Sequence, residues 1–248
     1  MGRDTGAYCI SHIGHSRQVI LRDILLSYHI EEITLDMTYS VGELYKKTRD
    51  KDGKPFVILP PKNKMDIYPR LKGVCVIGKD GRIPLEDSSC KCIIYSPPYK
   101  VIPRIRAIVD SDEGQRRREE ERHISFSSIN ELIETYRFHM EEIARLLERE
   151  GYAIVECQNV NASKKNINSP EYFWLLGEGT GLNMIDKFVF IPPMRGGAIR
   201  YFLLFQKSKS AKIKYLDFGE EKDRESFIST FYQNNVSKRK KKNGDVYL

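Results

Sequence analysis

The chain reads Cys-Ile-Ile-Tyr-Ser-Pro-Pro-Tyr at residues 92–99, an apolar, β-prone run that two prolines interrupt. We predict a short buried strand over Cys92–Tyr95, because brief apolar runs of this kind form buried strands. Proline cannot donate a main-chain hydrogen bond, so the strand is expected to end at Ser96. Ser96 and Tyr99 then lie at its carboxyl end, where ligands bind in open α/β sheets. An ordinary strand stopped by prolines, with Tyr99 in the core, fits the same residues.

A second cluster lies upstream, where residues 33–42 read Ile-Thr-Leu-Asp-Met-Thr-Tyr-Ser-Val-Gly. This pattern predicts a strand that runs into a turn of small residues, with Asp36 at the end of the strand. Gly42 stands where a helix can begin. A loop of this composition is suited to holding a cofactor.

Together the two clusters resemble the amino-methyltransferases of nucleic acids, which use S-adenosylmethionine to methylate the exocyclic amine of cytosine or adenine. Their hallmark is a (Ser/Asp/Asn)-Pro-Pro-(Tyr/Phe/Trp) tetrapeptide, which residues 96–99 match. Their cofactor loop reads Asp-x-Thr-x-Gly-x-Gly, which Asp36, Thr38 and Gly42 fit, whereas Ser40 replaces the first glycine. The resemblance covers residues 30–160. It implies an α/β, Rossmann-like class I methyltransferase fold, with a mostly parallel sheet and an antiparallel C-terminal hairpin.

The resemblance also implies roles for individual residues. The catalytic residues it implies are Ser96, Pro97, Pro98 and Tyr99. The Ser96 hydroxyl and the Pro97 carbonyl accept the two amine hydrogens, and Tyr99 stacks on a base flipped out of the duplex. The cofactor-binding residues it implies are Asp36, Met37, Thr38, Tyr39, Gly42, Asp66 and Asp80, although Asp66 and Asp80 also fit solvated loop carboxylates. Serine in the first motif position is commoner in cytosine-N4 enzymes, so N4-methylation of cytosine in DNA is expected, with adenine N6 in DNA or RNA as the alternative.

The net charge of +7 is concentrated at the C-terminus, where residues 238–242 supply five positive charges and leave +2 for the rest of the chain. This tail fits a solvated arm, and equally an arm that binds phosphate or acts as a nuclear address. Two further basic segments, residues 100–127 and 159–181, are candidates for contact with a nucleic-acid substrate. The predicted nucleic-acid-binding residues are Lys100, Arg104, Arg106, Lys164, Lys165, Lys238, Arg239, Lys240, Lys241 and Lys242.

The cysteine pattern predicts reduced, buried thiols and no metal site. Cys75, Cys90, Cys92 and Cys157 lie in or beside apolar strand-like runs, which is typical of free thiols in a reducing compartment. Cys90 and Cys92 have no second pair at zinc spacing. No run approaches the length of a membrane span, and the polar N-terminus is not a signal peptide. We expect a cytoplasmic or nucleoid-associated protein, or a nuclear one if the basic tail is an address.

Strand and helix patterns alternate along the chain, which predicts a single methyltransferase domain over residues 1–207 and a C-terminal extension over 208–248. Helices are expected over 16–28, over 128–150 with Gly151 as the stop, and from 169 to 176. Strands are expected near 33–37, 56–59, 74–77, 92–95, 152–157, 186–191 and 199–206. The last two are expected to form an antiparallel hairpin.

Two other functions remain open at this stage. His12-Ile13-Gly14-His15 spells the signature of nucleotidyltransferases and class I aminoacyl-tRNA synthetases, with a strand over residues 7–10 and Ser16 as a helix cap. Lys62-Asn63-Lys64-Met65 is only a faint echo of the second signature of those enzymes. A methyltransferase fold that has lost catalysis and binds nucleic acid or a partner is the other alternative, which Ser40 favours.

Overall fold

The computed structural model describes residues 10–14, 16–50, 52–66, 69, 71–77, 82–97, 99–101, 125–126, 128–162, 165–192 and 197–208. An eight-stranded sheet with the order β1-β13-β14-β10-β7-β2-β5-β6 forms its centre. Only β14 runs antiparallel to its neighbours, and all the other pairs are parallel. The strands of this sheet are β1 (Ile10–Gly14), β2 (Leu35–Asp36), β5 (Asn63–Asp66), β6 (Cys75–Val76), β7 (Cys90–Tyr95), β10 (Leu147–Gln158), β13 (Leu182–Phe190) and β14 (Arg200–Lys207).

The strand order reverses between β2 and β7. From β2 the chain builds outward through β5 to β6, and it then returns to add β7 and β10 on the other side of β2. This order and the parallel directions are those of a Rossmann-like, doubly wound sheet, in which ligands bind at the point of reversal. The predicted mostly parallel sheet with an antiparallel C-terminal hairpin, here β13 and β14, is confirmed.

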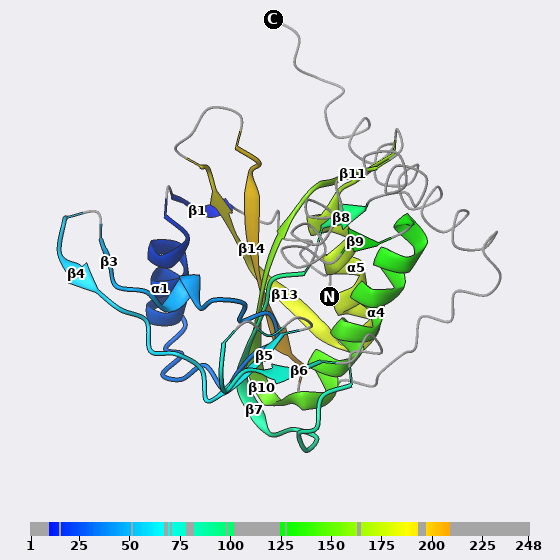
Figure 1. Cartoon of the computed structure of the whole chain (residues 1–248), viewed down its shortest axis with the longest axis horizontal. Helices are drawn as coiled ribbons and strands as arrows, with labels where there is room; N and C mark the ends of the chain where they lie inside the picture. The colour runs from blue at the N-terminus through cyan, green and yellow to red at the C-terminus, as the bar shows by residue number, and fades with distance from the viewer. Residues whose placement is uncertain are drawn as a thin grey trace, which may run out of the picture. The chain divides into compact units, whose positions relative to one another are not determined.

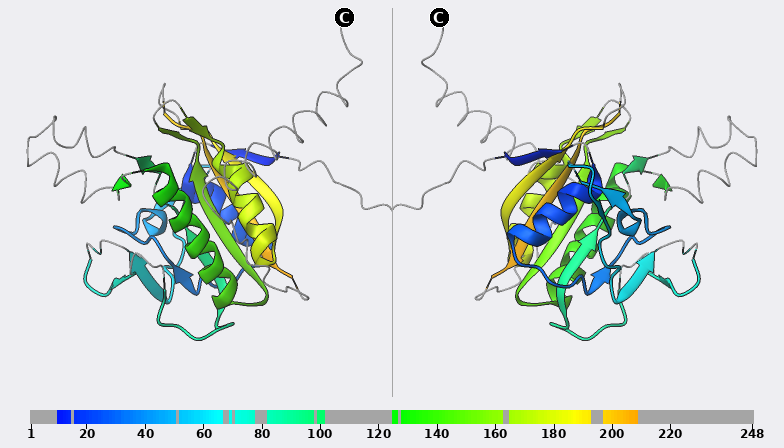
Figure 2. Two further views of the ribbon diagram at one scale, coloured as in Figure 1. Left: turned by 90° about the vertical axis from the view of Figure 1, so that its right-hand side faces the viewer. Right: turned by 90° about the vertical axis from the view of Figure 1, so that its left-hand side faces the viewer.

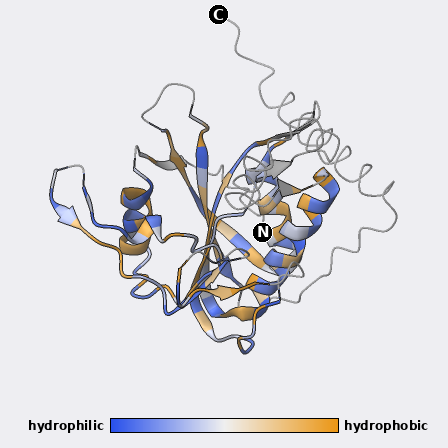
Figure 3. Cartoon of the chain, viewed as in Figure 1, coloured by the Kyte–Doolittle hydropathy of each residue, from blue (hydrophilic) through white to orange (hydrophobic). Residues whose placement is uncertain are grey.

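Helices cover both faces of the sheet, with α1 (Arg17–Ser27) on one face and α4 (Ile129–Leu146) and α5 (Ser169–Thr180) on the other (Figures 1 and 2). Polar side chains start α1 and α4 as the sequence predicts. Ser16 Oγ accepts a hydrogen bond from the main chain of Val19, and Ser128 Oγ accepts one from Glu131. Helix α4 alternates hydrophobic and hydrophilic residues (Figure 3) and buries its apolar stripe against the sheet.

The hydrophobic core has a separate layer on the α1 face of the sheet. Ile20, Leu21 and Ile24 of α1 pack there against strand residues that include Ile94 and Ile154. Because side chains alternate between the faces of a strand, the residue two positions after each of these isoleucines lies on the same face. This places Ser96 and Glu156 above the α1 layer, at the carboxyl ends of β7 and β10.

Three small sheets lie outside the main one. Strands β3 (Thr48–Arg49) and β4 (Pro55–Phe56) form a hairpin after the short 3₁₀ helix η1 (Glu43–Tyr45). Strands β8 (Lys100–Val101) and β9 (Ser125–Phe126) pair in parallel. Strands β11 (Val160–Ala162) and β12 (Lys165–Ile167) pair antiparallel, just before α5.

Several boundaries differ from the sequence-based expectations. The strand expected near 56–59 is wrong as a sheet strand, because that segment leaves the β3–β4 hairpin and the strand beside β2 is β5. Gly151 does not stop α4, which already ends at Leu146, and it lies inside β10 instead. A Cβ on Gly151 would meet the carbonyl oxygen of Lys91 at 3.0 Å, so the close approach of β7 explains the glycine. The helix expected to end at 176 extends to Thr180.

The thiol prediction is confirmed in part. Cys90, Cys92 and Cys157 are buried, whereas Cys75 on the edge strand β6 is exposed. The division at residue 207 stays a prediction, since the described residues end at Ser208. Among the helices that the structure describes, none is long and apolar enough to cross a membrane.

Candidate active site at the point of strand reversal

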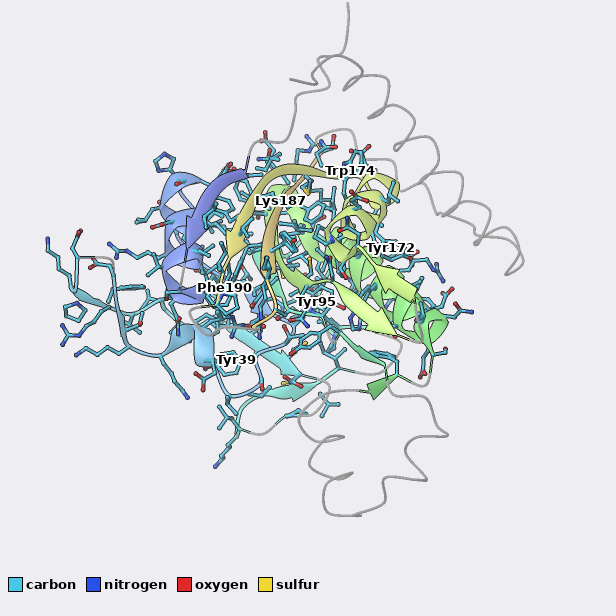
Figure 4. All side chains as sticks on the ribbon, turned by 90° about the horizontal axis from the view of Figure 1, so that it is seen from above. Tyr39, Tyr95, Tyr172, Trp174, Lys187 and Phe190 are labelled. Atoms are coloured by element: carbon cyan, nitrogen blue, oxygen red, sulfur yellow. The ribbon has the colours of Figure 1, made fainter. Side chains whose placement is uncertain are left out.

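The two motifs found in the sequence meet at the carboxyl ends of β2 and β7. Asp36 is the last residue of β2 and Ser96 directly follows β7, its neighbour in the sheet. Figure 4 looks onto this end of the sheet from above, with Tyr39 on one side of Tyr95 and with Tyr172 and Trp174 of α5 on the other. The structure therefore brings both predicted motifs to the position where a doubly wound sheet binds its ligand.

Asp36 organises the loop that follows it. Its carboxylate accepts hydrogen bonds from the main-chain N–H of Thr38 at 2.8 Å and from the Tyr45 hydroxyl at 2.6 Å. The side chain is only 2% exposed, so these contacts replace the water it would otherwise bind. Asp36 thus ties the loop of residues 36–42 to the 3₁₀ helix behind it.

Burial raises the pKa of Asp36 from its ordinary value of 3.8 to about 6, against the opposing effect of the hydrogen bonds from Tyr45 and Thr38. A raised acid pKa stabilises the fold at low pH, and that stabilisation is lost as the pH rises through 6. We expect wild type to lose about 2.5 kcal/mol of unfolding free energy between pH 4 and pH 7 through this group. The Asp36→Asn variant has no carboxyl group to titrate at this position. The difference in free energy of unfolding between wild type and Asp36→Asn should therefore change by the same amount between pH 4 and pH 7. Urea unfolding at a series of pH values measures this change. A difference that does not change with pH would contradict the assignment.

Thr38 joins the loop to the proline motif. Its Oγ1 accepts a hydrogen bond of 2.7 Å from the main-chain N–H of Ser96, the first residue after β7. The residue after a strand end would otherwise leave this N–H without a ladder partner. The Asp-x-Thr pattern therefore has a structural reason, because Asp36 fixes the loop and Thr38 fixes the start of the tetrapeptide.

Two further loop residues adopt left-handed backbone conformations, which glycine favours. Ser40 has φ of +50° and Gly42 has φ of +68°, so the serine occupies a left-handed position where the family has glycine. The carboxylate of Asp66, at the end of β5, accepts a hydrogen bond of 2.8 Å from the main-chain N–H of Ser40. Gly42 makes room for Tyr39, whose hydroxyl would lie 2.7 Å from an added Cβ. The ring of Tyr39 stacks on that of Tyr45 at 5.3 Å.

Packing behind the motif fixes the end of β7. Tyr95 is fully buried, and its hydroxyl lies 2.7 Å from Nδ1 of His139 on α4. Its ring makes an edge contact with Phe173 of α5, with 6.2 Å between the ring centroids. Two helices therefore hold the residue that directly precedes Ser96.

Sequence reasoning missed a charged cluster beside Ser96. Glu156 near the end of β10 is 2% exposed and accepts hydrogen bonds from two arginines, Arg17 at the start of α1 and Arg200 at the start of β14. Arg17 binds both oxygens of the carboxylate. The Ser96 hydroxyl lies 3.4 Å from Glu156 Oε2. The available signal was a lone carboxylate inside the apolar run of β10, since buried carboxylates need a partner.

The structure describes only some of the remaining predicted site residues, among them Met37, which is fully buried. The residues that lie outside the described part of the chain are Asp80, Pro98, Arg104, Arg106, Lys164 and residues 238–242. For Lys100 and Lys165 only the main chain is described, in β8 and β12. Pro97 is buried and Tyr99 is half-buried.

The His-Ile-Gly-His segment differs from its expected layout. The strand β1 covers Ile10–Gly14, so the first three residues of the signature, 12–14, lie in a strand instead of after one at residues 7–10. Ser16 caps α1 as expected. Lys64, in the expected second signature, is part of β5 and its Nζ lies 5.2 Å from the centroid of the Tyr39 ring. Within the described part of the chain, no three side chains of His, Cys, Asp or Glu are placed to hold a metal ion.

Comparison with known proteins gives similarity to solved structures alone. No family model matches the chain, and no curated protein matches it. A candidate DNA modification methylase from Thermus thermophilus, solved with S-adenosyl-L-methionine, is 14% identical over 54% of this chain, with a TM-score of 0.35. This chain covers 54% of that protein, so it spans about half the length of the first structures that it matches.

Two other solved structures match over more of the chain. The 1,6-didemethyltoxoflavin-N1-methyltransferase of Burkholderia thailandensis is 10% identical over 78% of this chain and 79% of its own, with a TM-score of 0.46. The N-methyltransferase NodS of Bradyrhizobium japonicum is 10% identical over 78% of this chain and 95% of its own, with a TM-score of 0.43. With scores below 0.5, the fold assignment rests on the strand order itself.

Proposed function

We propose that this protein transfers a methyl group from S-adenosylmethionine to the exocyclic amine of a nucleic-acid base. N4 of cytosine in DNA is the first candidate, and N6 of adenine in DNA or RNA is the second. The observation that carries the proposal is the hydrogen bond between Thr38 Oγ1 and the Ser96 N–H. It joins the predicted cofactor loop to the predicted transfer motif at the point of strand reversal, where a doubly wound sheet binds ligands.

In this proposal S-adenosylmethionine, when bound, supplies an electrophilic methyl group. The chain positions the acceptor. An exocyclic amine shares its lone pair with the ring, so it must become more tetrahedral before it can attack. The Ser96 hydroxyl and the Pro97 carbonyl accept hydrogen bonds from its two N–H groups and favour that geometry. Tyr99 stacks on the flipped base, which holds the amine in line.

The loop fits a cofactor through its main chain more readily than through its carboxylates. Asp36 already accepts hydrogen bonds from Thr38 and Tyr45, and Asp66 accepts one from Ser40. We therefore assign these two acids to shaping the loop, and Tyr39, with its half-buried ring, to contact with the cofactor. The predicted role of Asp80 stays a prediction.

The direct test is incubation of the full chain with methyl-labelled cofactor and mixed DNA and RNA, followed by mass spectrometry of the nucleosides. N4-methylcytosine or N6-methyladenine carrying the label is the expected product. A label found only in small molecules, or in no product, would contradict the proposal.

The Gly42→Leu variant should weaken cofactor binding at least tenfold in calorimetric titrations. A side chain there is strained at φ of +68° and displaces Tyr39 from its stack on Tyr45. Gly53→Leu is the matched control, because Gly53 has φ of +78° in the β3–β4 turn but nothing within 4 Å of an added Cβ. Equal cofactor affinity in both variants would remove residues 36–42 from the cofactor site.

One observation favours a second function, that of a non-catalytic nucleic-acid-binding or partner subunit. The carboxylates that the family resemblance assigns to the cofactor hold the loop together instead, and Ser40 adds a side chain at a glycine position. Absence of any heat of cofactor binding for the wild-type chain would favour this alternative. Cofactor binding with labelled transfer would exclude it.

A further inference from the structure

The cluster formed by Arg17, Glu156 and Arg200 carries more positive charge than its buried carboxylate requires. One arginine bound through two hydrogen bonds neutralises a carboxylate. Here Arg17 does so, and Arg200 Nη1 adds a further hydrogen bond of 2.9 Å to the same group. The cluster therefore holds two guanidinium groups against one carboxylate, next to the Ser96 hydroxyl.

Within the described part of the chain, both arginines keep unused hydrogen-bond donors, and both side chains are partly exposed. A guanidinium has five N–H donors. Among the residues that the structure describes, Arg17 uses Nε and Nη2 and Arg200 uses Nη1, all on Glu156. Their side chains are 27% and 29% exposed, whereas that of Glu156 is 2% exposed. Glu156 thus anchors the two guanidinium groups from below and leaves their outer edges open to an anion.

The sheet order decides on which side of Ser96 this anion lies. The Ser96 N–H is bonded to Thr38 on the β2 side, and its hydroxyl lies against Glu156 on the β10 side. Strand β14, which starts with Arg200, is the next strand beyond β10. With neighbouring strands about 4.8 Å apart, Arg200 lies two strand spacings, about 10 Å, across the sheet from Ser96, on the side away from the cofactor loop. In methyl transfer the acceptor approaches the methyl group opposite the sulfur atom of the cofactor. The nucleic acid is therefore expected on the side of Ser96 away from the cofactor loop.

We propose that Arg17 and Arg200, held by Glu156, bind a phosphate of the nucleic-acid strand next to the methylated base. This subsite rests on the proposed function, because Ser96 defines the side of the acceptor. Paired guanidinium groups match the geometry of phosphate oxygens. The contact fixes the register of the strand and reads no sequence.

The test measures binding of a single-stranded oligonucleotide, and does not depend on methyl transfer. A fluorescein-labelled DNA of roughly 15 nucleotides is titrated with the full chain in the presence of S-adenosylhomocysteine, over a range of KCl concentrations. The Arg200→Gln variant should bind about tenfold more weakly near physiological salt. It should also lower the slope of log K against log[KCl] by about 0.7, the value for one lost phosphate contact on a single strand.

Two control variants make the result specific. Arg149→Gln removes the same charge from an exposed residue at the amino end of β10, and should leave affinity and slope unchanged. Arg200→Lys keeps a charge that can meet phosphate, so it should retain most of the slope. If Arg200→Gln is poorly folded, Glu156→Gln/Arg200→Gln removes the buried charge as well, and should still show a lower slope than Glu156→Gln alone.

Each outcome decides the matter. Arg200→Gln behaving like Arg149→Gln would overturn the subsite. So would a loss of S-adenosylhomocysteine affinity in calorimetry with an unchanged salt slope, because the anion would then be the carboxylate of the cofactor. If the salt slope depends on Arg200 but no labelled product forms, the subsite is supported and only the proposed methyl transfer is contradicted. If labelled product forms but the salt slope does not depend on Arg200, methyl transfer is supported and the subsite is overturned.

Discussion

The Ser96→Ala variant is expected to lower the rate of methyl transfer about a hundredfold while cofactor and oligonucleotide still bind. Removing one preorganised hydrogen-bond partner from a reacting group costs enzymes about this factor. The Ser96 hydroxyl is proposed to act mainly on the amine in the transition state, so turnover should fall with little change in KM. The link between the motifs survives, because Thr38 contacts the main-chain N–H of Ser96 and not its side chain. Single-turnover assays with labelled cofactor measure the effect.

Ser89→Ala is the matched control for this variant. Ser89 directly precedes β7, at the amino end of the strand and so at the opposite end from Ser96. Its hydroxyl donates a hydrogen bond of 2.6 Å to the carbonyl oxygen of Glu86. The Ser89→Ala variant removes the same hydroxyl oxygen at a position outside the proposed site, so it should leave the transfer rate unchanged. If Ser96→Ala transfers methyl groups at the wild-type rate, the tetrapeptide is a strand terminator and the proposed active site is wrong.

The apolar runs of the central strands made much of the fold predictable. Cys92–Tyr95 lies inside β7, and the runs before Gln158 and Lys207 lie inside β10 and β14, because continuous apolar segments are buried on both faces. Capping residues fixed two helix starts, at Ser16 and Ser128. These elements could be predicted because the apolar run or the capping residue that determines each one lies within its own stretch of sequence.

Strand β5, next to β2, could not be predicted in this way, although β6 beyond it lies within the strand expected near 74–77. Strand β5 reads Asn-Lys-Met-Asp, and only Met65 in it is buried. The apolar run at 56–59 suggested a strand, yet Val57 is 54% exposed and Leu59 is 74% exposed. Position in the sheet, which depends on tertiary contacts, decides burial at this edge.

In the candidate site, too, features that are local in sequence could be predicted, and features that depend on tertiary contacts could not. The two motifs are local in sequence, so the loop and the tetrapeptide could each be named and placed at the carboxyl end of its own strand. The roles of Asp36 and Asp66 within the loop could not be predicted, because they depend on Tyr45 and on the φ of Ser40. The Glu156 cluster joins residues more than 40 positions apart, and no sequence spacing marks it.

The Phe173→Ala variant is expected to lower the free energy of unfolding by about 3–5 kcal/mol, the usual cost of removing a fully buried aromatic ring. Phe173 on α5 is 0% exposed and packs on Tyr136 of α4, with 4.7 Å between the ring centroids. Its edge contact with Tyr95 would be lost as well. Urea unfolding at constant pH measures the change.

Phe138→Ala is the matched control, since Phe138 lies on α4 but is 41% exposed, and it should cost less than about 1 kcal/mol. The pair also tests how the fold supports the site. Tyr95 directly precedes Ser96 and is held by Phe173 and His139, so a cavity at Phe173 should loosen the end of β7. Faster amide hydrogen exchange at Tyr95 and Ser96 in Phe173→Ala than in Phe138→Ala is therefore expected. Equal unfolding free energies in the two variants would mean that α5 does not anchor the motif.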